Sequence, residues 1–148
     1  MLDLESILNE WKEDSVIGSH KLDDVSQQTP ALHAKYLAYL SLTKLQLKRA
    51  ENKQMELLKQ KWLYYNGKMD EAELKATGWD LDPFNGLKIL KGDMEYYYNA
   101  DPEIQRSTEK VEYLKTIIST LTEIVDNLKW RHQTIGNMIR WRQFEAGG

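Results

Sequence analysis

A run of basic and aromatic residues between positions 44 and 68 carries the side chains best suited to binding chemistry. At helical spacing, Lys44, Lys48, Lys59 and Trp62 lie on roughly one face. Such cations neutralise phosphates, and aromatic rings stack on unpaired bases, which contributes about 1–3 kcal/mol per base. The combination suits a single-stranded nucleic acid. A solvated helix face with its aromatic residues in the core is the simpler alternative, and the pattern alone leaves both open.

Neighbouring side chains extend the same surface. Arg49 and Lys53 form a basic pair four residues apart beside the face, and Tyr64 and Tyr65 offer further rings for stacking. The inward positions of this helix alternate by three and four residues, but the series turns polar towards its end, at Lys61. Because a lysine at such a position does not stabilise a coiled coil, we expect this end of the helix to leave its partner and face something else.

A second basic segment lies near the end of the sequence and contains no acidic residue. It interleaves cations with two tryptophans: Lys129, Trp130, Arg131, Arg140, Trp141 and Arg142. The segment could extend a nucleic-acid surface or pair with the acidic middle of another subunit. Basic side chains that extend from a helix end into water are the third alternative.

Catalytic and metal-binding chemistry finds little support in the sequence. The histidines His20, His33 and His132 lie far apart and form no HExxH arrangement. Asp80 and Asp82 precede a proline in a sequence typical of a turn. The chain has no cysteine and no glycine-rich phosphate loop. We therefore expect no enzymatic activity, no metal, no cofactor and no bound nucleotide.

Composition bounds the class of protein. At 148 residues the chain is expected to form a single domain. The absence of cysteine fits a reducing compartment. The acidic, amphipathic first residues do not resemble a secretory signal, and no apolar run approaches the roughly 20 residues of a membrane span. A soluble intracellular protein is expected.

Charge is distributed unevenly along the chain. The formal net charge is −3, but residues 44–68 carry +5, whereas residues 1–43 carry −4, residues 69–113 carry −6 and residues 114–148 carry +2. Exposed charges more than about 8 Å apart are largely screened at physiological salt. A polyanion therefore meets the local basic patch and not the total charge.

Helical periodicity runs through most of the chain, and turn residues divide it. Thr29 and Pro30 suit the start of a long helix that stops at Asn66 and Gly67. One longer helix kinked at Pro30 is the alternative. Four segments are expected: an N-terminal helical segment (1–28), a long helix with a basic end (30–66), an acidic connector (70–100) and a heptad helix (102–143).

Shorter elements are expected before the long helix and within the connector. Asp3 is a possible cap for the first helix. Within the connector, Glu71 to Thr77 reads as a short helix closed by Gly78, and Met94 to Ala100 is assigned as helix because its surroundings are helical. We predict an all-α fold, a long antiparallel helical hairpin with short accessory helices.

A seven-residue repeat organises the last segment, which Asp101 caps. A repeat sustained over this length predicts a left-handed supercoil with another helix, either the 30–66 helix or a helix of a neighbouring subunit. The positions expected to support self-association are Val111, Leu114, Ile118, Leu121, Val125, Leu128, Ile135 and Ile139.

Three further motifs occur in order along the chain. Residues 58–68 read LKQKWLYYNGK, in which a basic, any, basic, apolar core is followed by Tyr-Tyr-x-Gly. Residues 90–94 read LKGDM and are followed by Asn-Ala-Asp at 99–101, and residues 144–147 read FEAG. Taken together, with the length of the chain, these motifs resemble the UvsY family of tailed-phage recombination mediators.

The resemblance implies an all-helical homo-oligomer, a ring of six or seven subunits, that binds and wraps single-stranded DNA. It implies a non-enzymatic mediator that helps to load a RecA-like recombinase onto DNA covered by the phage single-strand-binding protein. Contacts with both proteins are implied, in the cytoplasm of the infected bacterial host.

By position, Lys59 and Lys61 correspond to the DNA-contacting cations of the family. This chain departs from the family pattern with lysine in place of arginine at Lys61 and near Lys68, and with Trp62 in place of a smaller aliphatic residue. Lysine keeps the charge but loses the planar bidentate fork of arginine. The expected DNA-contacting set is Lys44, Lys48, Arg49, Lys53, Lys59, Lys61, Trp62, Tyr64, Tyr65 and Lys68.

Two other functions fit the same sequence pattern. One is a coiled-coil adaptor or assembly chaperone with no nucleic-acid role, which the heptads and the acidic middle would serve equally well. The other is an architectural protein that binds duplex DNA.

Overall fold

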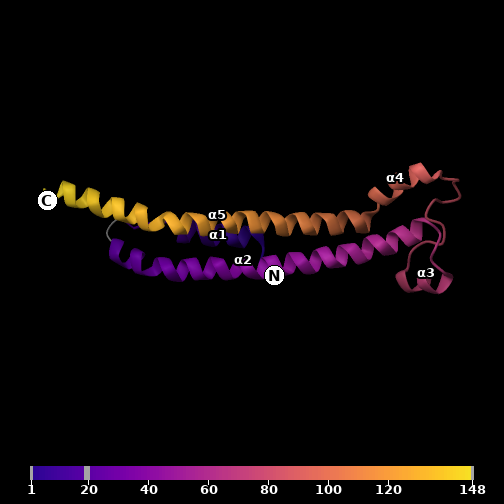
Figure 1. Cartoon of the computed structure of the whole chain (residues 1–148), viewed down its shortest axis with the longest axis horizontal. Helices are drawn as coiled ribbons and strands as arrows, with labels where there is room; N and C mark the ends of the chain where they lie inside the picture. The colour runs from indigo at the N-terminus through magenta and orange to yellow at the C-terminus, as the bar shows by residue number, and fades with distance from the viewer. Residues whose placement is uncertain (1, 19–20, 148) are drawn as a thin grey trace. The chain divides into compact units, whose positions relative to one another are not determined.

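The computed structural model describes residues 2–18 and 21–147. This part of the chain is helical and contains no strand, which confirms the all-α fold class (Figure 1). Its elements are α1 (Leu4–Asp14), α2 (Leu22–Tyr65), α3 (Glu71–Thr77), the 3-10 turn η1 (Lys91–Asp93), α4 (Met94–Asn99) and α5 (Pro102–Glu145).

The chain divides into two compact units, which we describe separately. The terminal unit comprises Met1–Gln46 and Leu114–Gly148, and the central unit comprises Leu47–Tyr113. The sequence predicts one domain and gives no indication of this division. Both long helices contribute residues to both units.

Asp3 caps α1, as expected. Its carboxylate accepts hydrogen bonds from the Ser6 amide at 2.8 Å and from the Ser6 hydroxyl at 2.9 Å. The first of these bonds is the main reason that the pKa of Asp3 lies below its ordinary value. A backbone N–H that has no partner within the helix is thereby satisfied.

An aliphatic core with one tyrosine holds the terminal unit together. Ile7 of α1 and Tyr36 of α2 have no exposed surface, at 0% each. They form one cluster with Leu40 and five residues of α5, which are Ile117, Leu121, Ile124, Val125 and Leu128. Within this unit the segments of α2 and α5 run antiparallel (Figure 1). This is the helical hairpin that the periodicity predicts.

Most heptad positions of α5 are covered by the chain itself. The buried ones, at most 5% exposed, are Val111, Leu114, Leu121, Val125, Leu128 and Ile135. Ile118 is half-buried beside the core cluster, and Ile139 is 38% exposed. Three of these residues, Leu121, Val125 and Leu128, pack with α1 and α2, so for them the partner is the chain's own helices. A role of these positions in self-association stays a prediction.

α2 begins at Leu22, so the boundary predicted at Pro30 is wrong and the alternative of one longer helix applies. Proline lacks the N–H of a helical hydrogen bond and its ring crowds the preceding turn. Pro30 is exposed, so its ring does not disturb the core. The hydroxyl of Thr29 donates to the Val25 carbonyl at 2.9 Å.

Charged side chains hold the C-terminal end of α1. The Lys35 ammonium lies 2.8 Å from both Glu10 and Asp14, and the Tyr36 hydroxyl donates to Asp14 at 2.7 Å. Arg131 of α5 donates to the Asp14 carbonyl at 2.7 Å. Burial opposes ionisation of Asp14, but the hydrogen bonds from Lys35 and Tyr36 hold its pKa below the ordinary value.

The core of the central unit is aromatic. Tyr64, Tyr65 and Leu74 are buried at its centre. Six partly buried residues pack against them: Met69, Trp79, Phe84, Met94, Tyr97 and Tyr98. α2 ends here at Tyr65, and Gly67 follows with a left-handed φ of 67°. The stop predicted at Asn66 and Gly67 is confirmed.

The short helices of the central unit also follow the prediction. α3 spans Glu71–Thr77 and begins with a reciprocal capping box between Asp70 and Glu73. It ends at Gly78, whose φ of 75° is left-handed. α4 confirms the helix assigned from Met94 onwards.

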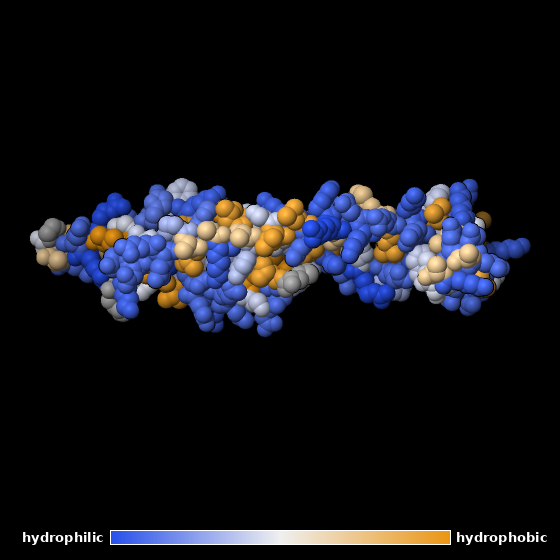
Figure 2. Space-filling view, turned by 90° about the horizontal axis from the view of Figure 1, so that it is seen from below, coloured by the Kyte–Doolittle hydropathy of each residue, from blue (hydrophilic) through white to orange (hydrophobic). Residues whose placement is uncertain are grey.

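The face shown in Figure 2 is mostly hydrophilic, with apolar side chains reaching the surface in places. On the terminal unit the exposed aliphatic residues of α2 are Leu37, Leu42 and Leu45. Scattered residues of this kind are ordinary on soluble proteins.

Candidate nucleic-acid interface

The basic face of α2 is open to solvent in the central unit. Lys48, Arg49, Lys53 and Lys59 are exposed, and none forms an ion pair within residues 2–18 and 21–147. Lys44, which belongs to the terminal unit, is exposed as well. A cation without a carboxylate partner remains available to neutralise a phosphate. These five residues therefore have the accessibility that the sequence prediction requires.

Trp62 lies at the C-terminal end of this face and is 49% exposed. The Lys68 ammonium lies 4.6 Å from the centroid of its indole ring, which is a cation–π contact. Lys59 precedes Trp62 by three residues and so lies on the same side of α2. An exposed ring with cations near it suits a base that stacks while its phosphates are neutralised.

Lys61 is not an open cation, and the structure corrects that expectation. The residue is 3% exposed, and its ammonium lies 2.9 Å from Asp101 and 3.4 Å from Glu103. The ring centroid of Trp79 lies 3.8 Å from the same nitrogen. A buried charge needs such partners to offset its loss of hydration. Lys61 is therefore engaged inside the central unit, and its contact with DNA stays a prediction that this geometry does not favour.

Tyr64 and Tyr65 are buried too, at 7% and 9% exposure. The Tyr64 hydroxyl donates to the Asp80 carbonyl and the Tyr65 hydroxyl donates to the Asp101 carboxylate, both at 2.7 Å. Burial, and next the bond to Asp101, raises the pKa of Tyr65. The rings pack the core and hold the loop and the start of α5 to α2. They are not the open stacking surfaces that the sequence suggested.

Asp101 connects these buried groups. Besides Lys61 and Tyr65, it accepts hydrogen bonds from the backbone amides of Glu103 at 2.9 Å and Ile104 at 3.1 Å, and so caps α5 as predicted. Burial by itself would raise its pKa, but the bonds from Tyr65 and Lys61 hold the pKa below the ordinary value. The sequence predicted the cap but not the buried counter-ion of Lys61.

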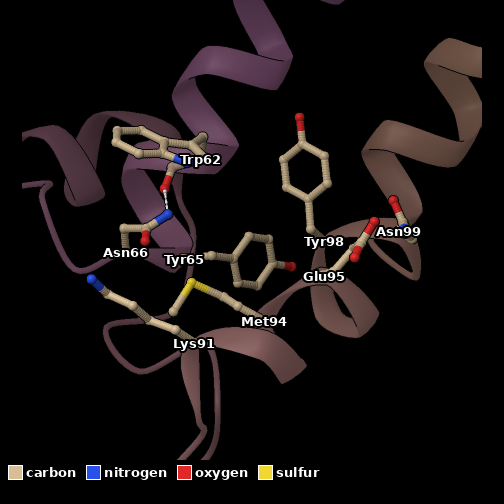
Figure 3. Close-up of a pocket in the computed structure, with 8 residues that line it drawn as sticks. All are labelled: Trp62, Tyr65, Asn66, Lys91, Met94, Glu95, Tyr98 and Asn99. Atoms are coloured by element: carbon tan, nitrogen blue, oxygen red, sulfur yellow. Dashed lines mark hydrogen bonds between the residues drawn. The ribbon is translucent and has the colours of Figure 1, made fainter.

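A cavity of about 500 Å³ opens beside Trp62 (Figure 3). Trp62, Tyr65 and Asn66 of α2 form one side, and the other side is formed by Lys91, Met94, Glu95, Tyr98 and Asn99. Figure 3 shows the Tyr65 ring between Trp62 and Tyr98. Sequence reasoning missed this cavity. The available signal was the spacing of Lys91, Glu95 and Tyr98, which places them on one face of a helical turn.

The second basic segment is not a uniform surface. Arg131 is 5% exposed because it binds the end of α1. Lys129 lies 3.5 Å from Asp126 in an exposed pair of the kind that contributes little to stability. Trp130 and Trp141 are 63% and 62% exposed. Arg140 and Arg142 are exposed too.

No group of three or more potential ligands gathers into a metal site within the described ranges. His33 is half-buried, the His132 ring lies 2.8 Å from the Lys129 carbonyl, and His20 lies outside the described residues. The Asp82 carboxylate accepts from the amides of Phe84 and Gly86, so it serves a turn. In the part of the chain that the structure describes, no helix is long and apolar enough to cross a membrane.

Comparison with known proteins gives consistent results. Residues 10–148 match the family model described as "Recombination, repair and ssDNA binding protein UvsY". The chain is 26% identical over 144 residues to the "Recombination protein uvsY" of Enterobacteria phage T4, covering 97% of this chain and 98% of that protein.

Solved structures of the bacteriophage T4 recombination mediator protein UvsY have the same fold. One crystal form superposes with a TM-score of 0.81 at 25% identity and covers 99% of each chain. A second gives a TM-score of 0.79 at 24% identity over 97% of this chain and 99% of that chain.

Proposed function

The chain belongs to the UvsY family of recombination, repair and single-stranded DNA-binding proteins, and from that premise we propose that it is a recombination mediator. In this role it wraps single-stranded DNA and promotes the loading of a RecA-like recombinase onto strands covered by a single-strand-binding protein. It contacts both proteins, has no catalytic step of its own, and acts in the cytoplasm of a phage-infected bacterium.

The exposed cation face of α2 carries this proposal. Lys48, Arg49, Lys53 and Lys59 have no carboxylate partner among the described residues, and Trp62 adds a half-exposed ring. Their charge is locally positive although the chain as a whole is acidic. We assign phosphate contact to these cations together with Lys44 and Lys68. Lys61, Tyr64 and Tyr65 have a different part, which is to position the end of α2 that presents them.

Self-association is the second part of the proposal. A few lysines per chain bind a strand weakly, but a ring of six or seven copies repeats them along one strand and raises the avidity by orders of magnitude. Apolar side chains exposed at the end of α5 support such assembly: Ile139 at 38%, Trp141 at 62% and Phe144 at 70%. The ring centroids of Trp141 and Phe144 lie 5.5 Å apart, so the two exposed rings form one aromatic pair.

A salt titration of binding to a labelled oligothymidylate tests the proposal. We expect saturable binding whose affinity falls with salt, because each neutralised phosphate of a single strand contributes a slope of about −0.7. The double variant Lys48→Ala with Lys59→Ala should weaken binding and flatten the slope by about 0.7 for each phosphate that is no longer neutralised. Light scattering should show an unchanged oligomer.

The matched control is Lys75→Ala with Lys110→Ala, which removes two exposed lysines from other helices of the same unit. Its affinity and slope should equal those of the wild type. A coiled-coil adaptor would show no salt-sensitive binding in any variant, and a duplex-binding protein would be competed away by double-stranded DNA. Equal effects of the two double variants would refute the assignment of the α2 face.

The loading step needs its own measurement. Recombinase filament formation on oligonucleotide covered with single-strand-binding protein should start sooner when this protein is added. The Lys48→Ala and Lys59→Ala double variant should lose most of that acceleration. An unchanged lag in the presence of the wild-type protein would contradict the mediator role while leaving DNA binding in place.

A further inference from the structure

The cavity beside Trp62 lies where an exposed stripe of α2 ends. Lys48, Met55, Lys59 and Trp62 follow one another at helical spacing along this stripe, and all are exposed. A strand that follows these cations would arrive at the mouth of the cavity. Resting on the proposed function, we infer that this cavity receives one unstacked nucleobase of the bound strand.

The walls of the cavity have the character that a base requires. Trp62 supplies a half-exposed ring, Tyr98 and the largely buried Tyr65 complete the aromatic lining, and Met94 supplies a polarisable thioether. The Tyr65 hydroxyl is bound to Asp101 and the Tyr98 hydroxyl donates to the Leu58 carbonyl at 3.3 Å. Because both hydroxyls are engaged, the orientation of the two rings is set before a ligand arrives, which reduces the cost of binding.

The size of the cavity suits a heterocycle. Ligand pockets of about 300–1,000 Å³ accommodate drug-sized molecules, and a nucleobase is smaller than most of these. At about 500 Å³, the cavity can hold a purine or a pyrimidine together with part of its sugar.

The charged side chains around the cavity favour entry of the base and exclude the phosphate. The exposed Glu95 carboxylate lines the cavity and repels an anion. Lys91 lines the same cavity and Lys68 lies against the Trp62 ring, so cations are available close to it for the flanking phosphates. A neutral base in the cavity avoids repulsion by Glu95, and the phosphates on either side of it can pair with Lys91 and Lys68.

Polar groups in the cavity can read the edge of a base. The Asn66 side chain donates one N–H to the Trp62 carbonyl at 2.7 Å, which leaves its oxygen and second N–H for another partner. Glu95 is an acceptor that suits an exocyclic amino group, as when a carboxylate accepts from the N4 amino group of cytosine. Thymine has no amino group, so the cavity should favour oligodeoxycytidylate over oligothymidylate.

Binding to an abasic oligonucleotide tests the inference separately from the proposed function. The probes are a 20-residue oligodeoxycytidylate and a strand of the same length whose central bases are replaced by tetrahydrofuran sites. The wild-type protein should bind the abasic strand at least about fivefold more weakly, the lower end of what one base stack contributes. Failure to bind either strand would overturn the proposed function. Equal binding of both strands would overturn only the base site.

Three variants locate the effect. Trp62→Ala removes a wall, and Met94→Trp fills the cavity while every existing ring is kept. Both should bring the ratio of the two dissociation constants close to one. Lys59→Ala should weaken both strands by the same factor and keep the ratio. Leu90→Ala removes an exposed side chain from the same segment that does not line the cavity, and it should behave as the wild type.

A ratio that survives in Met94→Trp would place the base contact outside the cavity and refute the inference. Glu95→Met, which nearly keeps the length of the side chain but removes both acceptor oxygens, should abolish the preference for oligodeoxycytidylate over oligothymidylate. Absence of that preference in the wild type would overturn the role assigned to Glu95.

Discussion

The two units use similar side chains for different purposes. In the terminal unit the core is largely aliphatic, and Lys35 and Arg131 fasten one end of a short helix. In the central unit the core is aromatic, Lys61 is enclosed within it, and other cations of the same helix remain in water. The terminal unit therefore uses these two cations to hold a helix, whereas the central unit encloses one cation of α2 and leaves others in water.

Two lysines of α2 show the contrast between an enclosed and an open cation within the central unit. Lys59 and Lys61 are two positions apart, so their side chains point about 200° apart around the helix axis. One is exposed and unpaired among the described residues, and the other is 3% exposed between two carboxylates. A basic motif read along the chain therefore contains two environments, one open to solvent and one enclosed in the core.

The largest effect is expected from Lys61→Ala. The variant leaves Asp101 buried without its cation, which should lower the free energy of unfolding by about 3–5 kcal/mol. Urea denaturation followed by tryptophan fluorescence measures it. Lys59→Ala is the control and should stay within about 0.5 kcal/mol of the wild type. Similar losses in the two variants would break the distinction between the buried and the exposed lysine.

The next effect is expected from Leu121→Ala in the terminal unit. Leu121 has 0% exposure, and truncation of a buried leucine costs about 2–5 kcal/mol. The affinity of the folded variant for single-stranded DNA should change less than twofold, because the basic face of the central unit is untouched. An affinity loss as large as that of the Lys48→Ala and Lys59→Ala double variant would show that binding is not confined to that face.

A pair of hydroxyl deletions sharpens the comparison further. Tyr65→Phe and Tyr36→Phe each remove a hydrogen bond of 2.7 Å to a carboxylate. The side chain of Asp101 is 3% exposed and that of Asp14 is 25% exposed, so water can replace the lost donor more readily at Asp14. We expect a loss of about 1.5–3 kcal/mol for Tyr65→Phe and a smaller loss for Tyr36→Phe. Thermal unfolding of the two variants side by side measures the difference.

The smallest effect concerns pH. Asp14 and Asp101 have pKa values in the folded protein below their ordinary value of 3.8. The stability that their ionised forms contribute is therefore present above pH 3.8 and is lost as the pH falls through the lower folded values. Urea denaturation from about pH 5 down to about pH 2 should show this decline. Asp14→Asn and Asp101→Asn should each remove part of it, and a decline unchanged in both variants would contradict the assignment.

Much of the fold could be predicted because local signals determine it. Asp3, Asp70 and Asp101 cap helices through contacts with residues close in sequence, and Gly67 and Gly78 end helices through their own backbone freedom. The start of α2 could not be predicted in this way. The Pro30 signal favours a boundary, but the helix continues through it with the proline on its exposed side.

The candidate site was predicted only in part, because burial depends on distant residues. Lys59 and Trp62 are exposed as expected, but Lys61 meets Asp101 and Trp79, whose proximity no local pattern reveals. The cavity beside Trp62 needs a second chain segment that folds back onto α2. Periodicity shows which residues share a face, whereas the partner of that face is decided by the tertiary fold.

Ile7 has a practical consequence for anyone who trims this chain. It is fully buried in the terminal unit, yet it precedes the span 10–148 that the family model matches. A version truncated to that span would keep Tyr36 and Leu121 but lose Ile7, which packs in the same core. Apolar side chains that are buried in the full chain would then be exposed. Truncated chains would then aggregate through this exposed apolar surface, and light scattering would detect non-specific aggregates in place of the proposed ring.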